Sequence, residues 1–196
     1  MDYTENKTDI IQRWLEENLS EERYIHSLGV MEAAEELAVM FGLNKEKAKI
    51  AGLLHDAAKC FPNEKLLEII HKHIPEVQDC ELLNYKTLHA PVSSWIAQQQ
   101  FEINDKEILD AIRWHTLGKC EMSNFEKIIF LADKIEARTR DIEFRNKCLG
   151  VLKEENGLNK ALFKCFEATI KSLVDRRLAI CHMTIDVYNE LLHAIY

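Results

Sequence analysis

Glycine and proline are scarce in this sequence of 196 residues, which has 6 Gly and 3 Pro. Both residue types interrupt helices, so few interruptions are expected. The alternating β-branched pattern that is typical of strands is also absent from the sequence. Because Ala, Leu, Ile, Glu and Lys are abundant in their place, we predict an all-α fold of roughly eight to ten helices.

Long apolar runs, basic charge and paired cysteines are missing as well. No run approaches the about 20 residues of a membrane-spanning helix, and the polar start MDYTENKTDI is unlike a signal peptide. The formal net charge of −8 argues against a nucleic-acid partner. No C-x-x-C motif occurs among the six cysteines, which are Cys60, Cys80, Cys120, Cys148, Cys165 and Cys181. We therefore expect a cytoplasmic protein with reduced, structural thiols.

Helix boundaries can be placed from capping signals and apolar spacing. A first helix is expected to open at Thr8 or Asp9, and a second runs from Ser20 to Gly42. Asn44 should cap a third helix that runs to about Lys59. Further helices are expected over 64–72, 87–100 and 105–116, after a capping box at 123–126, from residue 158 onward, and around 187–192. Periodicity weakens between residues 140 and 158. The pattern predicts one domain over 1–196.

Ionisable residues interrupt several apolar helical segments. His55 and Asp56 stand side by side in AGLLHDAAK, and a carboxylate buried there must be paired or coordinated. The other such residues are His26, His89, His115 and Asp133. Any one of the histidines alone would be an ordinary hydrogen-bonded core residue. Taken together, the six residues predict a shared metal site.

The ligand types narrow the choice of metal. Imidazole and carboxylate without thiolate suit Fe, Mn, Zn, Ni or Co. Six candidate ligands exceed one tetrahedral ion, so either one metal with open positions or two metals are expected. In a two-metal site a carboxylate can bridge ions about 3.5–4 Å apart. Asp56 is the candidate bridge, because neighbouring helical residues diverge by about 100° and let His55 and Asp56 flank one site from two angles.

The motifs resemble a known family. The pattern His26, His55-Asp56, Asp133 resembles the HD-domain superfamily of metal-dependent phosphohydrolases. The segments RYIHSLGVMEAAEELA, AGLLHDAAK, LHAPV, AIRWHTLGKCEMSNFEKIIFLADKIEARTR and VYNELL resemble the YqeK family over about residues 10–193. Two positions depart from the family pattern: Ala90 replaces a glycine, and Leu117-Gly-Lys119 replaces a segment with threonine and arginine. The second departure concerns phosphate contacts, not the metal site.

The resemblance implies a symmetrical diadenosine tetraphosphatase that forms two ADP at a two-metal, iron-containing centre. It implies a single-domain HD-type helical bundle with its core at about 20–140 and C-terminal helices at about 141–196. One metal would be held by His26, His55, Asp56 and Asp133, and Asp56 would bridge to a second metal at His89 and His115. Manganese, cobalt, nickel or zinc are the alternative ions.

The mechanistic hypothesis is attack of a metal-bridged hydroxide on an inner phosphorus. The catalytic residues would be Asp56 and Lys59. An acidic protein needs local cations for a phosphate chain, and the candidate contacts are Lys59, Arg113, Thr116, Lys119, Lys134 and Arg138. The remaining histidines are expected to be solvent-exposed; they are His71, His73, His182 and His193.

Three alternatives stay open at the level of sequence. The first is a hydrolase of another nucleotide within the same superfamily, such as a mono- or triphosphate or a cyclic nucleotide. The second is a nucleotide sensor that holds metal without turnover, and the third is a purely structural metal site. The amphipathic C-terminal helices could complete the core or form a homodimer.

Overall fold

The computed structural model describes residues 7–196, and these form α-helices, one 3-10 turn and no strand. The prediction of an all-α fold is therefore confirmed for the described part of the chain. The predicted single domain starts at residue 1, and residues 1–6 lie outside this part. The helices are α1 (Lys7–Asn18), α2 (Glu21–Met40), α3 (Lys45–Leu54), α4 (Asn63–His73), α5 (Asp79–Leu82), η1 (Tyr85–Thr87), α6 (His89–Phe101), α7 (Lys106–Trp114), α8 (Asn124–Ile135), α9 (Ile142–Val151), α10 (Gly157–Asp175) and α11 (His182–Ile195).

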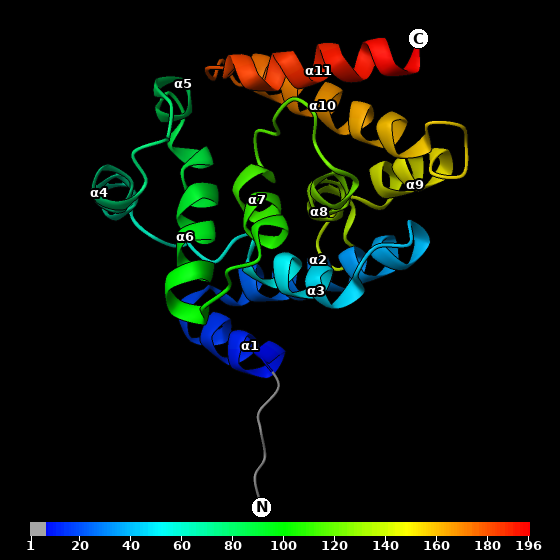
Figure 1. The fold of residues 1–196 in the computed structure, drawn as a ribbon. Helices are drawn as coiled ribbons and strands as arrows, with labels where there is room; N and C mark the ends of the chain where they lie inside the picture. Colours follow the sequence, from blue (N-terminus) through cyan, green and yellow to red (C-terminus); the bar gives the residue numbers. More distant parts are fainter. Residues whose placement is uncertain (1–6) are drawn as a thin grey trace, which may run out of the picture.

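The helices lie in three groups, as Figure 1 shows. At one end α2 packs on α3, with α1 beneath them. The middle group consists of α6, α7 and α8, and α8 also contacts α2. At the opposite end α10 packs against α9 and α11, while α4 and α5 flank α6. The interior where α2, α3, α6, α7 and α8 converge is thus enclosed by helices from distant parts of the sequence.

Side-chain caps begin the helices at the predicted places. Ser20 caps α2 by accepting from the amide of Arg23, and Asn44 caps α3 by accepting from the amide of Lys47. Ser123 and Glu126 form the predicted capping box at the start of α8. The three signals are correct because each satisfies amides that a helix N-terminus leaves without partners.

The prediction that the third helix reaches Lys59 is wrong, since α3 ends at Leu54. The amide of Ala58 donates to the hydroxyl of Ser93 (3.0 Å) and not to a carbonyl four residues earlier. The amides of Ala57 and Lys59 bond instead three residues back, at 3.1 and 2.9 Å. His55 and Asp56 therefore stand on a tightened turn after α3 and not within it.

Two helices were missed by the sequence patterns. The short α5 lies where no helix is expected, and α9 lies in the segment with weak periodicity. Asp141 caps α9 through the amide of Phe144. Only Cys148 of α9 is buried, so an apolar stripe never develops and the helix leaves no periodic signal.

Two glycines let helices approach closely around the interior. A Cβ on Gly52 of α3 would lie 2.9–3.0 Å from backbone atoms of Val30 and Met31 in α2. A Cβ on Gly29 of α2 would overlap the carboxylate of Glu136, which follows α8. These contacts bring α2, α3 and the end of α8 together at the level of His26 and His55.

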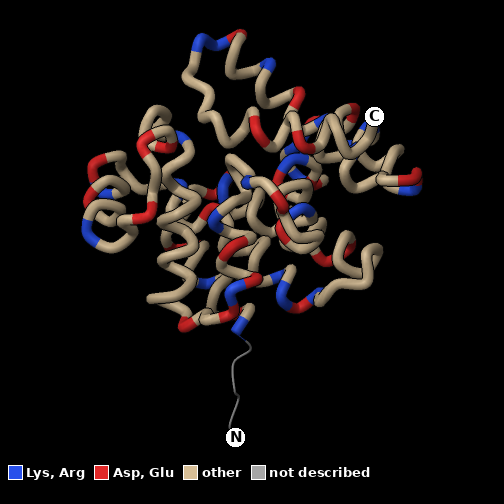
Figure 2. The backbone as a smooth tube through the Cα atoms, turned by 45° about the horizontal axis from the view of Figure 1, so that its top comes forward, with Lys and Arg blue, Asp and Glu red and all other residues tan. Residues whose placement is uncertain are grey.

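Charge is distributed without a single basic face. Acidic and basic positions are interspersed along the helices in Figure 2, in keeping with the net charge of −8. No helix among residues 7–196 is both long and apolar enough to cross a bilayer. Any anionic ligand must therefore be attracted by cations placed locally.

Candidate metal centre

The predicted ligands gather from five parts of the chain into the enclosed interior. His26 comes from α2, His89 begins α6, and His115 directly follows α7. Asp133 lies in the last turn of α8, while His55 and Asp56 come from the turn after α3. All six side chains are buried, with no residue more than 5% exposed.

One group forms around His26 and His55. Their Nε2 atoms are 3.3 Å apart, and the Nε2 of His26 is 3.1 Å from Oδ1 of Asp133. Oδ2 of Asp56 faces the same point, 3.7 Å from Nε2 of His55 and 4.0 Å from Nε2 of His26. This group brings together the four residues predicted for the first metal.

A second group forms around His89 and His115. Their Nε2 atoms are 3.1 Å apart. The other oxygen of Asp56, Oδ1, is 2.9 Å from Nε2 of His89 and 3.5 Å from Nε2 of His115. Asp56 thus presents one carboxylate oxygen to each group, which is the arrangement that a bridging ligand requires.

The outer nitrogen of each ring fixes its orientation. Nδ1 of His55 lies 2.7 Å from the carbonyl of Gly52, and Nδ1 of His115 lies 2.7 Å from that of Ile112. Nδ1 of His89 lies 2.8 Å from the carbonyl of Lys86. Because a carbonyl only accepts, each of these Nδ1 atoms carries the proton and the neutral ring turns a bare Nε2 inward. His26 differs in that its Nδ1 faces the carboxylate of Glu136, at 3.2 Å.

The inward atoms repel one another unless a cation lies among them. Unprotonated Nε2 atoms lie close to each other and to the oxygens of Asp56, so in each contact one lone pair faces another with no hydrogen between them. The buried Oδ1 of Asp56 has no hydrogen-bond partner despite its short distance to His89. A buried carboxylate oxygen without a hydrogen bond is costly, and a divalent cation would remove the cost. The donor set therefore fits divalent metal ions.

Electrostatics keep the site in the ionisation state that metal binding needs. Burial lowers the pKa of His55 to about 3 and that of His89 to about 4, so both rings are neutral near pH 7. Burial opposes ionisation of Asp56, but His55, His89 and Lys59 outweigh it and hold the pKa of Asp56 well below its usual value. Burial likewise opposes ionisation of Asp133, and Lys134, His26 and Arg140 hold its pKa low.

Three of the predicted phosphate contacts lie at the centre. The ammonium group of Lys59 is 3.1 Å from Nε2 of His89 and 3.4 Å from Oδ1 of Asp56. Lys134 pairs with Asp133 at 2.7 Å. The hydroxyl of Thr116 is 3.0 Å from Nε2 of His115. These side chains are near enough to contact a phosphate group bound at the candidate metal centre.

The other three predicted contacts are engaged elsewhere. Arg113 pairs at 2.7 Å with the buried Glu81. Lys119 pairs at 2.8 Å with Glu126 of the α8 capping box. Arg138 forms a two-pronged ion pair with Glu32 at the surface, at 2.6 and 3.0 Å. The structure does not bring these three to the cluster, and their role in phosphate binding stays a prediction.

Sequence reasoning missed three charged groups at the centre. Arg140 contacts Oδ1 of Asp133 at 2.6 Å, and Arg23 lies 3.6 Å from Oδ2 of Asp56. Glu136 is fully buried against His26. The sequence held a signal for Arg23 and Glu136. Arg23 lies three residues before His26 in α2, and Glu136 lies three residues after Asp133 at the end of α8. Each therefore shares a helix face with a predicted ligand. Arg140 lies in a turn beyond α8, where spacing carries no such information.

A cleft leads from solvent to the second group. It has a volume of about 710 Å³ and is lined by Lys59 and His89 at its inner end and by Phe61 and Tyr85 farther out. A smaller cavity of about 150 Å³ adjoins it and is lined by Thr116 and Lys134, among others. The cluster is therefore reachable, although each ligand is buried.

The remaining histidines are exposed, as predicted: His71, His73, His182 and His193. His73 stacks on the ring of Trp95, with ring centroids 5.0 Å apart. None of them lies in the six-residue cluster.

Comparisons with known proteins agree with this picture. Residues 23–138 match the family model of the HD domain. The chain is 36% identical over 184 residues to a symmetrical bis(5′-nucleosyl)-tetraphosphatase of Bacillus subtilis, covering 90% of this chain and 93% of that one. A protein of the same description from Staphylococcus aureus is 34% identical over 180 residues, covering 91% of each chain.

A solved structure matches the whole fold. It is a predicted HD superfamily hydrolase involved in NAD metabolism from Clostridium acetobutylicum, 40% identical, with a TM-score of 0.88. The match covers 95% of this chain and 97% of that one. The chain therefore belongs to the HD-domain family and groups within it with the tetraphosphatases that its motifs resemble.

Proposed function

We propose that this protein is a metal-dependent phosphohydrolase that splits diadenosine tetraphosphate symmetrically into two ADP. The observation that carries the proposal is Asp56, whose two oxygens face two separate groups of buried imidazoles. The tetraphosphatase relatives cover nearly the whole chain and support the substrate class. In symmetrical hydrolysis water forms a bond to an inner phosphorus, and the central P–O bond breaks to release the second ADP.

The proposed cofactor is a pair of divalent metal ions, with iron as the expected ion and Mn, Co, Ni or Zn as alternatives. His26, His55, Asp56 and Asp133 would hold one ion, and Asp56, His89 and His115 the other. Bound there, the ions would supply Lewis-acid polarisation of the phosphates and make water a nucleophile near neutral pH. Asp56 belongs to both ligand sets and is the residue on which the pair depends.

The chain's own cations are proposed to position the phosphate chain. Lys59 stands beside Asp56 and lines the cleft, so its ammonium group can donate to a phosphate oxygen while it balances the carboxylate. Lys134 and Arg140 occupy the other side, next to Asp133. With Thr116 as a neutral donor, these residues offer charge-assisted hydrogen bonds beside both ligand groups.

The outer part of the cleft suits a nucleoside. Tyr85 is half-exposed, and its ring lines the wall. Phe61 lines it too, although the ammonium group of Lys65 covers one of its faces at 3.6 Å. A base stacked on Tyr85 would gain about 1–3 kcal/mol. An acidic protein would in this way bind a polyanion through local contacts and not through its overall charge.

Product analysis tests the proposal. Purified protein loaded anaerobically with Fe²⁺, and separately with Mn²⁺, is incubated with diadenosine tetraphosphate, and the nucleotides are separated by anion exchange. We expect ADP as the sole product. AMP with ATP would contradict symmetrical attack. No product from protein shown to hold metal would redirect the search to mono-, tri- and cyclic nucleotides, and survival of all of these would indicate a sensor.

Replacement of the bridging residue tests the metal assignment. Asp56→Asn removes the charge shared by both groups, so we expect metal content to fall at both and kcat/KM to drop by more than about 100-fold. Asp175→Asn, at the exposed end of α10, is the matched control and should behave as the parent protein. Unchanged turnover in Asp56→Asn would refute the scheme.

A further inference from the structure

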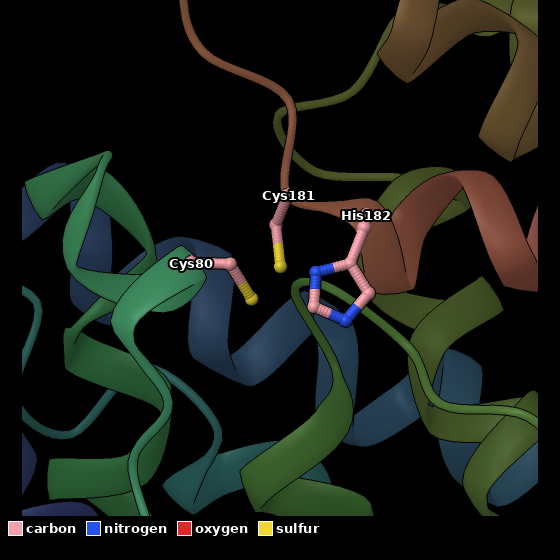
Figure 3. A group of neighbouring side chains, drawn as sticks. All are labelled: Cys80, Cys181 and His182. Atoms are coloured by element: carbon pink, nitrogen blue, oxygen red, sulfur yellow. The ribbon is translucent and has the colours of Figure 1, made fainter.

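A second group of metal-binding side chains lies outside the centre. Cys80 of α5 meets Cys181 and His182 at the start of α11, and Figure 3 shows both sulfurs and the imidazole turned toward one another. One ligand atom from each residue lies within 4.8 Å of the other two. None of the three residues belongs to the histidine–aspartate cluster, so the two groups are independent.

Neither helix capping nor a disulfide bond accounts for these residues. Cys181 holds the N-cap position of α11, but its side chain makes no capping hydrogen bond. That position favours Ser, Thr, Asp or Asn, whose oxygens do cap. Cys80 and Cys181 are both free thiols. Two unbridged sulfurs thus face each other at a place where neither one caps a helix.

We propose that Cys80, Cys181 and His182 form a second metal site, which takes a borderline-soft divalent ion of the zinc class. Two thiolates and one imidazole match the set of two cysteines and one histidine that holds zinc with one open position. The imidazole favours a metal over a disulfide, because a metal would use all three side chains and a disulfide only the two sulfurs. Each thiol gives its proton to solvent when the ion binds.

The position of the site gives the ion a structural consequence. Cys80 and Cys181 line the same cavity of about 150 Å³ as Thr116 and Lys134, the two side chains that contact His115 and Asp133. An ion held by Cys80 and Cys181 would join α5 to the start of α11 across the wall of this cavity. Three protein ligands leave a fourth tetrahedral position for water or an outside ligand. The ion would therefore fix the wall of this cavity beside the histidine–aspartate centre, without sharing a ligand with that centre.

Cobalt spectroscopy separates this site from the histidine–aspartate centre. Reduced full-length protein is titrated with Co²⁺, and the sulfur-to-cobalt charge-transfer band in the near ultraviolet is followed. The centre has no sulfur ligand, so the band does not report on the centre, and the thiol variants assign it to particular cysteines. We expect the band in the parent protein and in Cys120→Ser, which removes an exposed thiol outside the group. Cys181→Ser should abolish it.

Affinity and folding complete the test. His182→Ala should keep a weaker band and lower the affinity for Co²⁺ by about 10-fold or more. Thermal unfolding of each variant checks that the fold is retained, and Cys80→Ser gives a second thiol variant if Cys181→Ser fails to fold. A parent protein without the band, or a band that persists in either folded thiol variant, would overturn the proposal. Neither result would bear on hydrolysis at the centre.

Discussion

Each imidazole of the centre is held by its outer nitrogen, but the holding group differs among the four. Backbone carbonyls three residues earlier hold His55, His89 and His115. His26 depends on the side chain of Glu136. A carbonyl cannot be removed by substitution, whereas Glu136 can, so His26 is the ligand whose support is open to a direct test.

Glu136→Gln should weaken metal binding without removing a ligand. The amide oxygen of glutamine can still accept from Nδ1 of His26, but it lacks the charge that makes the ring a better donor. We expect metal affinity to fall by about 10–100-fold, measured by competition with a chelator. Glu32→Gln, at a half-exposed carboxylate paired with Arg138, is the control. Equal affinity in both variants would show that Glu136 does not tune the ligand.

At this scale sequence reasoning finds the six residues that the structure brings together, but it misses the side chains that support them. Asp133 is conspicuous because a carboxylate inside IIFLADKI has no apolar explanation. Glu136 is equally buried, yet it lies beyond the apolar run, and only its spacing of three residues from Asp133 marks it. For Arg113, the position beside a predicted ligand suggests a phosphate contact, which stays a prediction. Its ion pair with Glu81, a residue far away in sequence, has no local signal.

At the scale of helices, the approach of α3 to α2 brings His55 against His26. Gly52 is the point of contact, because its missing side chain leaves room for the backbone of α2. The turn after α3 then carries His55 and Asp56 into the interior, and the hydroxyl of Ser93 in α6 holds that turn. The geometry of two ligands therefore depends on one contact between helices and one hydrogen bond.

Gly52→Ala should destabilise the protein and disturb the first ligand group. The added methyl group would lie 2.9–3.0 Å from backbone atoms of α2, which cannot rotate away. Overpacking of this kind costs about 1–3 kcal/mol, so we expect a lower Tm together with weaker metal binding. The matched control is Gly150→Ala in α9, where nothing lies within 4 Å of the new Cβ. That variant should gain up to about 1 kcal/mol.

A Tm of Gly52→Ala that equals the parent value would show that α2 and α3 can separate freely. The comparison with Gly150→Ala removes the effect of glycine on the unfolded chain, because both substitutions reduce that freedom alike.

Helix prediction succeeds where capping and an apolar stripe coincide, as in α2 and α8. It fails for α9, whose cap is present but whose only buried residue is Cys148. It also overextends α3, since the residues AAK after His55 have good helix propensity and only the contact with Ser93 ends the helix. A tertiary hydrogen bond of this kind has no local signature.

At the scale of the molecule, the centre joins helices that adjoin in space but not in sequence. Ligands from residues 26 to 133 meet in one interior, and α10 and α11 close the opposite end (Figure 1). Sequence order alone does not predict such convergence. The cost of burying six ionisable residues indicated a shared site, and the resemblance to a family divided them between two metals. The meeting of Cys80 with Cys181 had no such guide, because no spacing motif spans that distance. The homodimer stays one of the two roles considered for the C-terminal helices.

Metal removal should lower the stability of the whole protein. Without metal ions the inward lone pairs of the two groups repel each other, and Oδ1 of Asp56 has no hydrogen bond, with only the ammonium group of Lys59 at 3.4 Å. An ion that binds only the folded state adds about 2.7 kcal/mol when its free concentration is about 100 times its Kd. We expect chelator-treated protein to melt at a lower temperature and readdition of Mn²⁺ to restore the Tm. A Tm that changes neither on chelation nor on readdition of Mn²⁺ would contradict metal binding at the core.

The three carbonyl-bound rings also bear on how the ions arrive. His55, His89 and His115 each fold back on the carbonyl three residues earlier, at 2.7–2.8 Å, so their rotation is already restricted before any ion enters. Little side-chain entropy then remains to be lost on capture. Exchange of one metal for another should therefore proceed as substitution within a rigid receptor, at a rate governed by the ion's own loss of water and not by rearrangement of the helices.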